Sequence, residues 1–171
     1  MSKKLPAGGD LPAMTLAAVG GGEVTLGGPR DKWQAVFVYR GLHCPICKTY
    51  LGKLESKLSE FADMGTEVVA VSGDPKEKAE AFAKEVGLTM PVAYDLSVDQ
   101  MRALGLYIST PRSDTETDRP FPEPGLFVAT PEGKLQIVEI ANAPFVRPDL
   151  DLVLRGLNRG REGYPVRGTM E

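Results

Sequence analysis

Hydrophobic positions along the chain alternate between short extended runs and stretches with helical spacing. Four runs, Ala35–Tyr39, Val68–Val71, Leu126–Ala129 and Leu135–Val138, have the length and mostly apolar composition of strands. The first two are apolar at every position, which predicts strands covered on both faces of a sheet. The last two are joined by Thr130-Pro131-Glu132-Gly133, a turn sequence that predicts an antiparallel hairpin.

Helical spacing follows the first strands and recurs near the end of the chain. Apolar residues from Ile46 to Phe61 lie three or four positions apart, which predicts one long amphipathic helix that ends near Asp63. Three further helices are expected: from an N-cap at Asp74, through Pro75, to Gly87; from a capping box at Ser97 and Gln100 to Gly105; and from near Pro148 through Leu157.

The remaining segments are short strands and loops. Met14 to Leu26 reads as a small hairpin around three glycines, and Pro91–Tyr94 as a short strand. Ser109 to Pro124 is polar and proline-rich, which predicts a loop. Strands that alternate with helices require parallel connections, whereas the last hairpin is antiparallel. The pattern therefore predicts an α/β fold with a mixed central sheet, helices on both faces and an N-terminal β-hairpin.

Length and composition limit the number of domains, the classes of binding partner and the location that we expect. The 171 residues suit one domain, with residues 1–9 as a loose lead-in and residues 159–171 as a C-terminal tail. A net charge of −3 gives no electrostatic basis for binding nucleic acid or an anionic membrane. No apolar stretch reaches the length of a membrane span, and Pro6 interrupts the start before a signal-peptide core could form, so a cytoplasmic location is expected.

The two cysteines carry the clearest chemical signal. Cys44 and Cys47 are spaced C-x-x-C between a predicted strand and a predicted helix, with Pro45 at the first helical position. Cys44 is then the N-cap, where free backbone N–H groups stabilise a thiolate, so it is the predicted nucleophile. Cys47 lies one turn further on and is the predicted resolving thiol. Structural disulfides are rare in the cytoplasm, which favours a catalytic pair.

Two other interpretations of the cysteines are weaker. They could be core residues, or half of a zinc site. Zinc needs four ligands, and the chain has one histidine, His43, and no second cysteine pair. The haem-attachment pattern C-x-x-C-H is absent because residue 48 is lysine. We therefore expect no metal and no cofactor.

From Asp10 to Leu157 the chain resembles the peroxiredoxin-like branch of the thioredoxin-fold superfamily, the alkyl hydroperoxide reductase/thiol-specific antioxidant family. Three segments carry the resemblance: Val36–Tyr39 leading into Cys44, Glu67–Asp74, and Pro124–Gly133. The resemblance implies a thioredoxin-like fold and a redox-active thiol.

The chain departs from the family pattern at three positions. In the signature P-x-x-x-T-x-x-C, Phe37 stands at the proline and Gly41 at the peroxide-binding threonine, and Pro124 stands where the family carries an arginine. Pro124 instead matches the cis-proline of thioredoxin-like and cytochrome-maturation reductases, so a cis Glu123–Pro124 bond beside the dithiol is predicted.

Three basic residues are candidates to replace the missing donors. Arg40 and His43 flank the thiol, and Arg119 could fold back from the long loop, although a charged residue in a polar loop is usually solvated. His43 could lower the thiol pKa when protonated, or only shield Cys44. The predicted catalytic set is Cys44, Cys47, Arg40, His43 and Pro124.

The predicted function is that of a thiol oxidoreductase that cycles Cys44 and Cys47 between dithiol and disulfide. It would act in thiol–disulfide exchange on a disulfide-containing protein, and in antioxidant defence. A thiol-dependent hydroperoxide reductase is one alternative, and a non-catalytic redox sensor that contacts partners through its tail is another. The resemblance implies a thioredoxin- or glutathione-type reductant and a homodimer.

Overall fold

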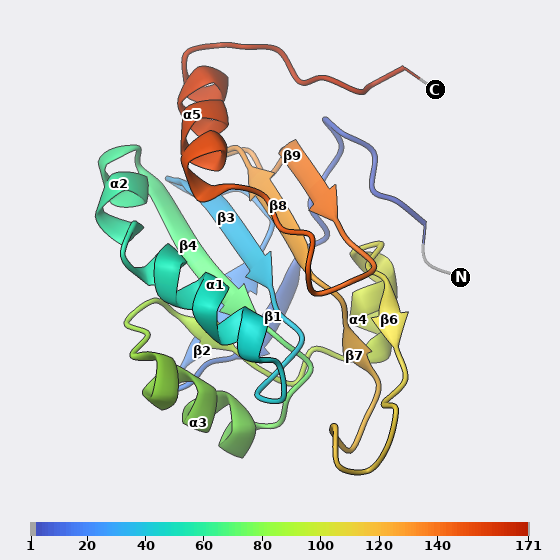
Figure 1. Cartoon of the computed structure of the whole chain (residues 1–171). Coiled ribbons are helices and arrows are strands. Elements are labelled where there is room, and N and C mark those ends of the chain that lie inside the picture. Colours follow the sequence, from blue (N-terminus) through green and yellow to red (C-terminus); the bar gives the residue numbers. More distant parts are fainter. Residues whose placement is uncertain (1–2, 171) are drawn as a thin grey trace.

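The structure is a computed structural model that describes residues 3–170 of the chain, and its centre is a five-stranded mixed sheet (Figure 1). The strand order is β5-β4-β3-β8-β9. β3 lies in the middle, parallel to β4 and antiparallel to β8, and the β8–β9 pair is antiparallel. The strands are β3 (Trp33–Val38), β4 (Thr66–Val71), β5 (Val92–Ala93), β8 (Gly125–Ala129) and β9 (Leu135–Ile140). The predicted mixed α/β sheet is confirmed.

Helices cover one face of this sheet, and a hairpin with a short helix covers the other (Figure 1). The first layer contains α1 (Pro45–Glu55), α2 (Leu58–Asp63), α3 (Lys76–Val86) and α5 (Leu150–Arg161). The second contains β1 (Met14–Ala17), β2 (Glu23–Leu26) and α4 (Val98–Ala103), which begins at the predicted Ser97 capping box. Within the described residues, no helix is long and apolar enough to cross a membrane.

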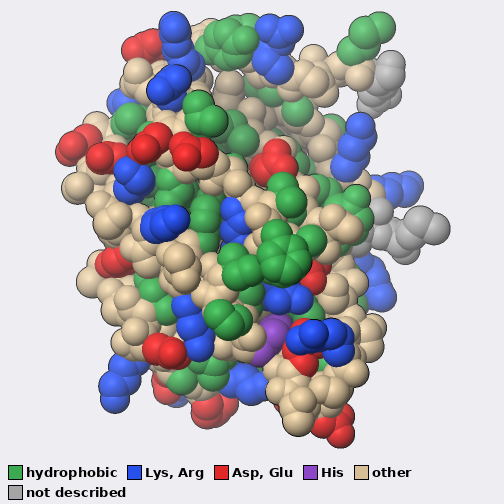
Figure 2. Space-filling view, in the orientation of Figure 1, with side chains coloured by type: hydrophobic (Ala, Val, Ile, Leu, Met, Phe, Trp, Pro, Cys, Tyr) green, Lys and Arg blue, Asp and Glu red, His purple; other side chains and the backbone are tan. Residues whose placement is uncertain are grey.

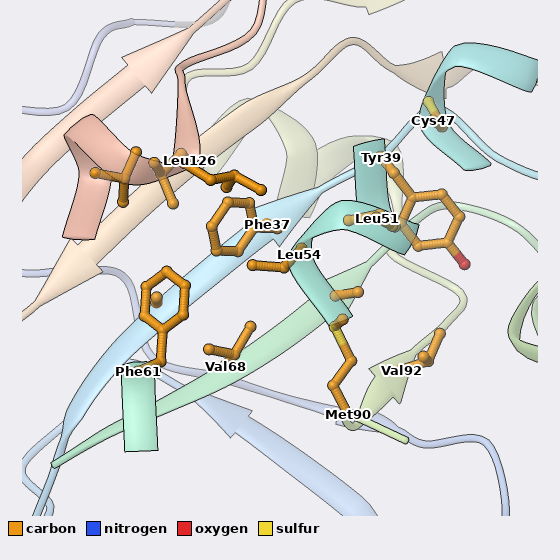
Figure 3. Packing of buried hydrophobic residues seen from close by; sticks show 14 of the residues in the cluster. Phe37, Tyr39, Cys47, Leu51, Leu54, Phe61, Val68, Met90, Val92 and Leu126 are labelled. Atoms are coloured by element: carbon orange, nitrogen blue, oxygen red, sulfur yellow. The ribbon is translucent and has the colours of Figure 1, made fainter. Parts of the chain in front are cut away.

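The hydrophobic core between β3, β4 and the helical layer extends to the C-x-x-C segment and includes Cys47. Figure 3 shows Phe37 and Tyr39 from the end of β3 packed among Leu51 and Leu54 of α1. Cys47 lies at the edge of the same cluster and is fully buried. Both faces of β3 are covered, which explains why its sequence is almost continuously apolar. The sheet and α1 therefore hold the C-x-x-C segment on a rigid base.

The helix predicted from Ile46 to Asp63 is wrong in one respect, because the structure divides it into α1 and α2. The Ser56 hydroxyl donates to the Lys53 carbonyl, and Lys57 N–H donates to Leu54 O three residues back. These contacts tighten the last turn of α1 and end it, since the carbonyls can no longer continue a regular ladder. The break turns α2 so that Phe61 is fully buried.

The start of α3 also differs from the prediction. The N-cap is Pro75, with no side-chain cap hydrogen bond, rather than Asp74. The Asp74 carboxylate instead accepts a hydrogen bond of 2.8 Å from Leu42 N–H, in the loop that precedes Cys44. A contact across 32 residues has replaced the local cap that the sequence favours.

The segment predicted as a loop from Ser109 to Pro124 contains part of a small two-stranded sheet. β6 (Ile108–Ser109) pairs antiparallel with β7 (Phe121–Pro122). The pairing buries Phe121, which is 3% exposed, and two-residue strands give too short a pattern to detect. The predicted tail is also shorter than expected, because α5 continues to Arg161.

Candidate active site

Cys44 and Cys47 lie where the chain leaves β3 and enters α1. Cys44 is the N-cap of α1, as predicted, and its Sγ accepts a hydrogen bond of 3.2 Å from Cys47 N–H. Both cysteines are free thiols in this structure, and they are 1% and 0% exposed. The helix start thus places a donor on Cys44 and brings the two side chains within one turn of each other.

The two thiols differ in acidity. Hydrogen bonds from the Cys47 side chain and backbone, with the cations of Arg40 and Arg147, lower the pKa of Cys44 to about 6, against the effect of burial. Burial and the hydrogen bond with Cys44 raise the pKa of Cys47 well above the ordinary thiol range. Cys44 therefore carries the thiolate at neutral pH, and Cys47 keeps its proton.

Arg147 is a site residue that the sequence reasoning missed. It comes from the segment before α5, and its Nη2 lies 3.0 Å from Cys47 Sγ and 3.9 Å from Cys44 Sγ. Nε donates to the Pro144 carbonyl at 2.7 Å, and the guanidinium lies 5.3 Å from the centre of the Tyr50 ring. No local pattern around residue 147 indicates a thiol partner, because the contact joins residues 100 or more apart.

Arg40, a predicted site residue, is held beside the dithiol by a buried carboxylate. Its Nε donates to both carboxylate oxygens of Glu123, at 2.9 and 3.2 Å, and Ser109 Oγ donates to the same carboxylate at 2.8 Å. The guanidinium lies 4.9 Å from the Phe121 ring centre, and the Arg40 backbone N–H is 3.5 Å from Cys47 Sγ. The short β6–β7 sheet therefore positions Arg40.

His43 lies on the side of the loop that faces β7. Its ring stacks edge-on against Phe121 at 4.5 Å, and neither ring nitrogen has a hydrogen-bond partner among the described residues. Burial and the nearby Arg40 cation lower the pKa of His43, so the ring is neutral at neutral pH. Figure 2 shows the single histidine of the chain in a recess, bordered by basic, acidic and hydrophobic side chains. The neutral ring therefore supplies no cation to Cys44.

The prediction of a cis Glu123–Pro124 bond is wrong, since the described residues contain no cis peptide bond. Glu123 N–H donates to Tyr107 O, and Ala141 N–H donates to Pro124 O, so the chain runs extended from β7 into β8. Pro124 lines a small cavity beside Tyr50 and Arg147. Pro124 and Arg147 therefore both belong to the wall of this cavity.

Arg119 does not contribute a cation to the dithiol. Its guanidinium contacts Asp118 at 3.3 Å and Asp95 at 3.8 Å. Within the part of the chain that the structure describes, no three His, Cys, Asp or Glu side chains are grouped so that they could hold a metal ion.

Comparisons with known proteins identify the family of this chain. Residues 7–138 match the family model described as the AhpC/TSA family. A protein of Mycobacterium tuberculosis assigned to the peroxiredoxins is 31% identical over 104 residues, which are 61% of this chain and 66% of that protein. A 1-Cys peroxiredoxin of Medicago truncatula is 26% identical over 73% of this chain and 59% of its own length. The chain thus spans about two thirds or less of these relatives.

Solved structures share the fold. A peroxiredoxin-like protein of Aquifex aeolicus superposes with a TM-score of 0.79 at 21% identity, covering 92% of this chain and 89% of that chain. AhpC of Mycobacterium tuberculosis superposes with a TM-score of 0.76 at 21% identity, over 93% and 94% of the two chains. The family match covers most of the chain, the fold is that of the solved relatives, and the chain belongs to the AhpC/TSA family.

Proposed function

We propose that the chain is a peroxiredoxin-like thiol oxidoreductase in which a hydroperoxide oxidises Cys44, and Cys47 then closes an intrachain disulfide. The observation that carries the proposal is the Cys44 thiol at the helix N-cap. It accepts the Cys47 N–H and lies beside two guanidinium groups. Donors that stabilise a thiolate also stabilise the negative charge of an attack on an O–O bond.

Access to the sulfur favours a small oxidant. Cys44 is 1% exposed, so a partner protein could not bring a disulfide to its Sγ without local opening of the site. A hydroperoxide also needs an opening, but a smaller one, because only its two oxygens must reach Cys44 Sγ. Burial of Cys44 therefore favours a hydroperoxide as the substrate, whereas the sequence favours a protein disulfide.

In the first step, the Cys44 thiolate attacks the outer oxygen of the hydroperoxide. The S–O bond forms as the O–O bond breaks, Cys44 loses two electrons, and the leaving alkoxide takes a proton to become an alcohol. The product on the protein is Cys44 sulfenic acid. The Cys47 backbone N–H and the Arg147 Nη2 lie 3.2 and 3.9 Å from Cys44 Sγ, and as donors they take the place of the threonine that the family pattern has at position 41.

In the second step, Cys47 attacks the sulfur of Cys44. The Cys44 thiolate charge has disappeared by then, so one cause of the raised Cys47 pKa is removed, while Arg147 remains 3.0 Å from Cys47 Sγ. Cys47 then loses its proton more readily. The S–S bond forms as the S–O bond breaks, and the hydroxyl leaves as water with the proton that Cys47 gave up.

Two electrons must return from outside the chain. A thioredoxin- or glutathione-type thiol would supply them by exchange with the disulfide, which restores Cys44 and Cys47. The cytoplasmic location and the homodimer stay predictions.

Exchange with a protein disulfide is the second candidate, because both cysteines belong to one chain and lie one turn apart. In that reaction the Cys44 thiolate would attack a partner's disulfide, and Cys47 would release the reduced partner.

Stopped-flow oxidation of the reduced protein tests the proposal. We expect fast oxidation by hydrogen peroxide or an organic hydroperoxide, no reaction in Cys44→Ser, and a trappable sulfenic acid in Cys47→Ser. The control is Arg155→Met, which replaces an exposed residue of α5. A wild-type rate no faster than that of a free small thiol, together with rapid reduction of protein disulfides, would favour the second candidate.

A further inference from the structure

The strongest unused feature of the site is the buried carboxylate of Asp74. It lies at the end of β4, is 3% exposed, and accepts the Leu42 N–H at 2.8 Å. Burial raises the pKa of this carboxyl group, so the ionised form is costly here. The adjacent helix α3 could have used Asp74 as its cap and instead begins at Pro75 without a side-chain cap. The carboxylate therefore accepts a hydrogen bond from the loop before Cys44 and does not cap α3.

The backbone of Asp74 is fixed on both sides. Its N–H donates to Ser72 Oγ at 3.2 Å, and its carbonyl accepts from Asp95 N–H at 2.8 Å. Ser72 is itself tied to Leu96 through its carbonyl. The carboxylate is consequently presented from a backbone segment that is held in place just after β4.

Gly41 makes room for this contact. Its φ is +142°, a conformation that favours glycine, and a Cβ at this position would lie 2.9 and 3.0 Å from the two oxygens of Asp74. Gly41 is the residue that stands at the threonine of the family pattern. The carboxylate thus fills the space into which a side chain at position 41 would project.

We infer that Asp74 is a positioning residue for the nucleophile: through Leu42 N–H it holds the loop of residues 41–43, and so the placement of Cys44 at the helix start. The inference rests on the proposed function, in which Cys44 is the reacting group. Cys44 N–H donates to Gly41 O at 3.1 Å, so the loop held by Asp74 is a closed turn that ends on the nucleophile. Displacement of this turn would move Cys44 Sγ relative to Cys47 N–H and Arg147 Nη2.

Substitution at position 74 tests the inference. Asp74→Ala removes the acceptor, and we expect a higher Cys44 pKa and a rate constant for peroxide oxidation about tenfold lower, even at a pH where the thiol is ionised. Asp74→Asn keeps an oxygen for Leu42 N–H and should lose less. The control is Glu77→Gln, which removes an exposed acidic residue from the first turn of α3 and should leave both quantities unchanged. Thiolate absorbance gives the pKa, and stopped flow gives the rate.

A second variant tests the contact from the side of the loop, and Gly41→Ala alone keeps the test decisive if Asp74→Ala does not fold, because a wild-type rate and Cys44 pKa in Gly41→Ala would then overturn the inference. Gly41→Ala places a methyl group against the carboxylate, and it should also slow oxidation. In the double variant the clash with the carboxylate is absent and only the contact of the new Cβ with His43 Nδ1, at 3.0 Å, remains, so the combined loss should be smaller than the product of the two single losses. Multiplicative losses would overturn the inference.

The inference and the proposed function can fail separately. A folded Asp74→Ala protein with the wild-type Cys44 pKa and rate, or an equal loss in Asp74→Asn, would overturn the positioning role. A wild-type protein that hydroperoxides do not oxidise would refute the proposed function alone. In that case the Cys44 pKa of the Asp74 variants would still report on the position of the loop.

Discussion

Arg147→Met tests the electrostatic account of Cys44 most directly. The substitution removes the cation that lies 3.0 Å from Cys47 Sγ and 3.9 Å from Cys44 Sγ, and keeps an unbranched stem to pack near Tyr50. Two unit charges about 4 Å apart at an effective dielectric of about 20 interact by about 4 kcal/mol, which is an upper bound. A hydrogen bond to a charged group contributes about 1.5–3 kcal/mol net.

This energy converts into a measurable change of acidity. At about 1.4 kcal/mol per unit, the loss should raise the Cys44 pKa by roughly one to two units. Starting from a pKa of about 6, the thiolate fraction at neutral pH would fall from about nine tenths to between about one half and one tenth. The rate of peroxide oxidation at neutral pH should fall at least in proportion, and part of the loss should return at higher pH.

The assay is a pH titration of thiolate absorbance, with stopped-flow oxidation of the same proteins; the raised pKa of Cys47 keeps its thiol out of the titration of Cys44. Arg155→Met is the matched control, since Arg155 is exposed on α5. Arg147→Lys should retain part of the effect, because it keeps the charge but loses the fork of donors. A Cys44 pKa and an oxidation rate that stay at the control values in Arg147→Met would refute the electrostatic account.

Three further outcomes are expected. Arg40→Met leaves Glu123, which is 3% exposed, without its cation, and should lower the free energy of unfolding in urea by about 3–5 kcal/mol. The double variant Arg40→Met/Glu123→Gln should recover most of this loss. Wild-type stability of Arg40→Met would contradict the pairing. His43 has a lowered pKa, so the unfolded chain binds its proton more readily and stability rises with pH through about 6.5. His43→Phe should lose this part of the pH dependence of the urea midpoint, and an unchanged profile would show that His43 contributes none. Ser97→Ala removes the capping box of α4 and should cost about 1 kcal/mol in thermal unfolding without slowing peroxide oxidation, whereas Ser97→Asn should be nearly neutral.

Local patterns were sufficient for the frame of the molecule. Three local signals place Cys44 at a helix start: the apolar run before it, the helical spacing after it and Pro45 at the first helical position. Each signal depends on residues within one or two turns of chain. The Ser97 capping box and the left-handed Gly87 at the end of α3 were predictable for the same reason. Spacing alone also predicted that Cys47 lies one turn from Cys44, and its N–H donates to Cys44 Sγ.

The groups that tune the thiol depend on contacts between distant segments. Arg147 reaches the cysteines across 100 residues or more, and Glu123 reaches Arg40 across 83. Asp74 resembles a helix cap in its local sequence, yet it binds the loop at Leu42 because the sheet brings the end of β4 beside the end of β3. Periodicity records which face of an element is buried. It carries no information on which charged side chain meets which sulfur, since that pairing arises only when the elements pack.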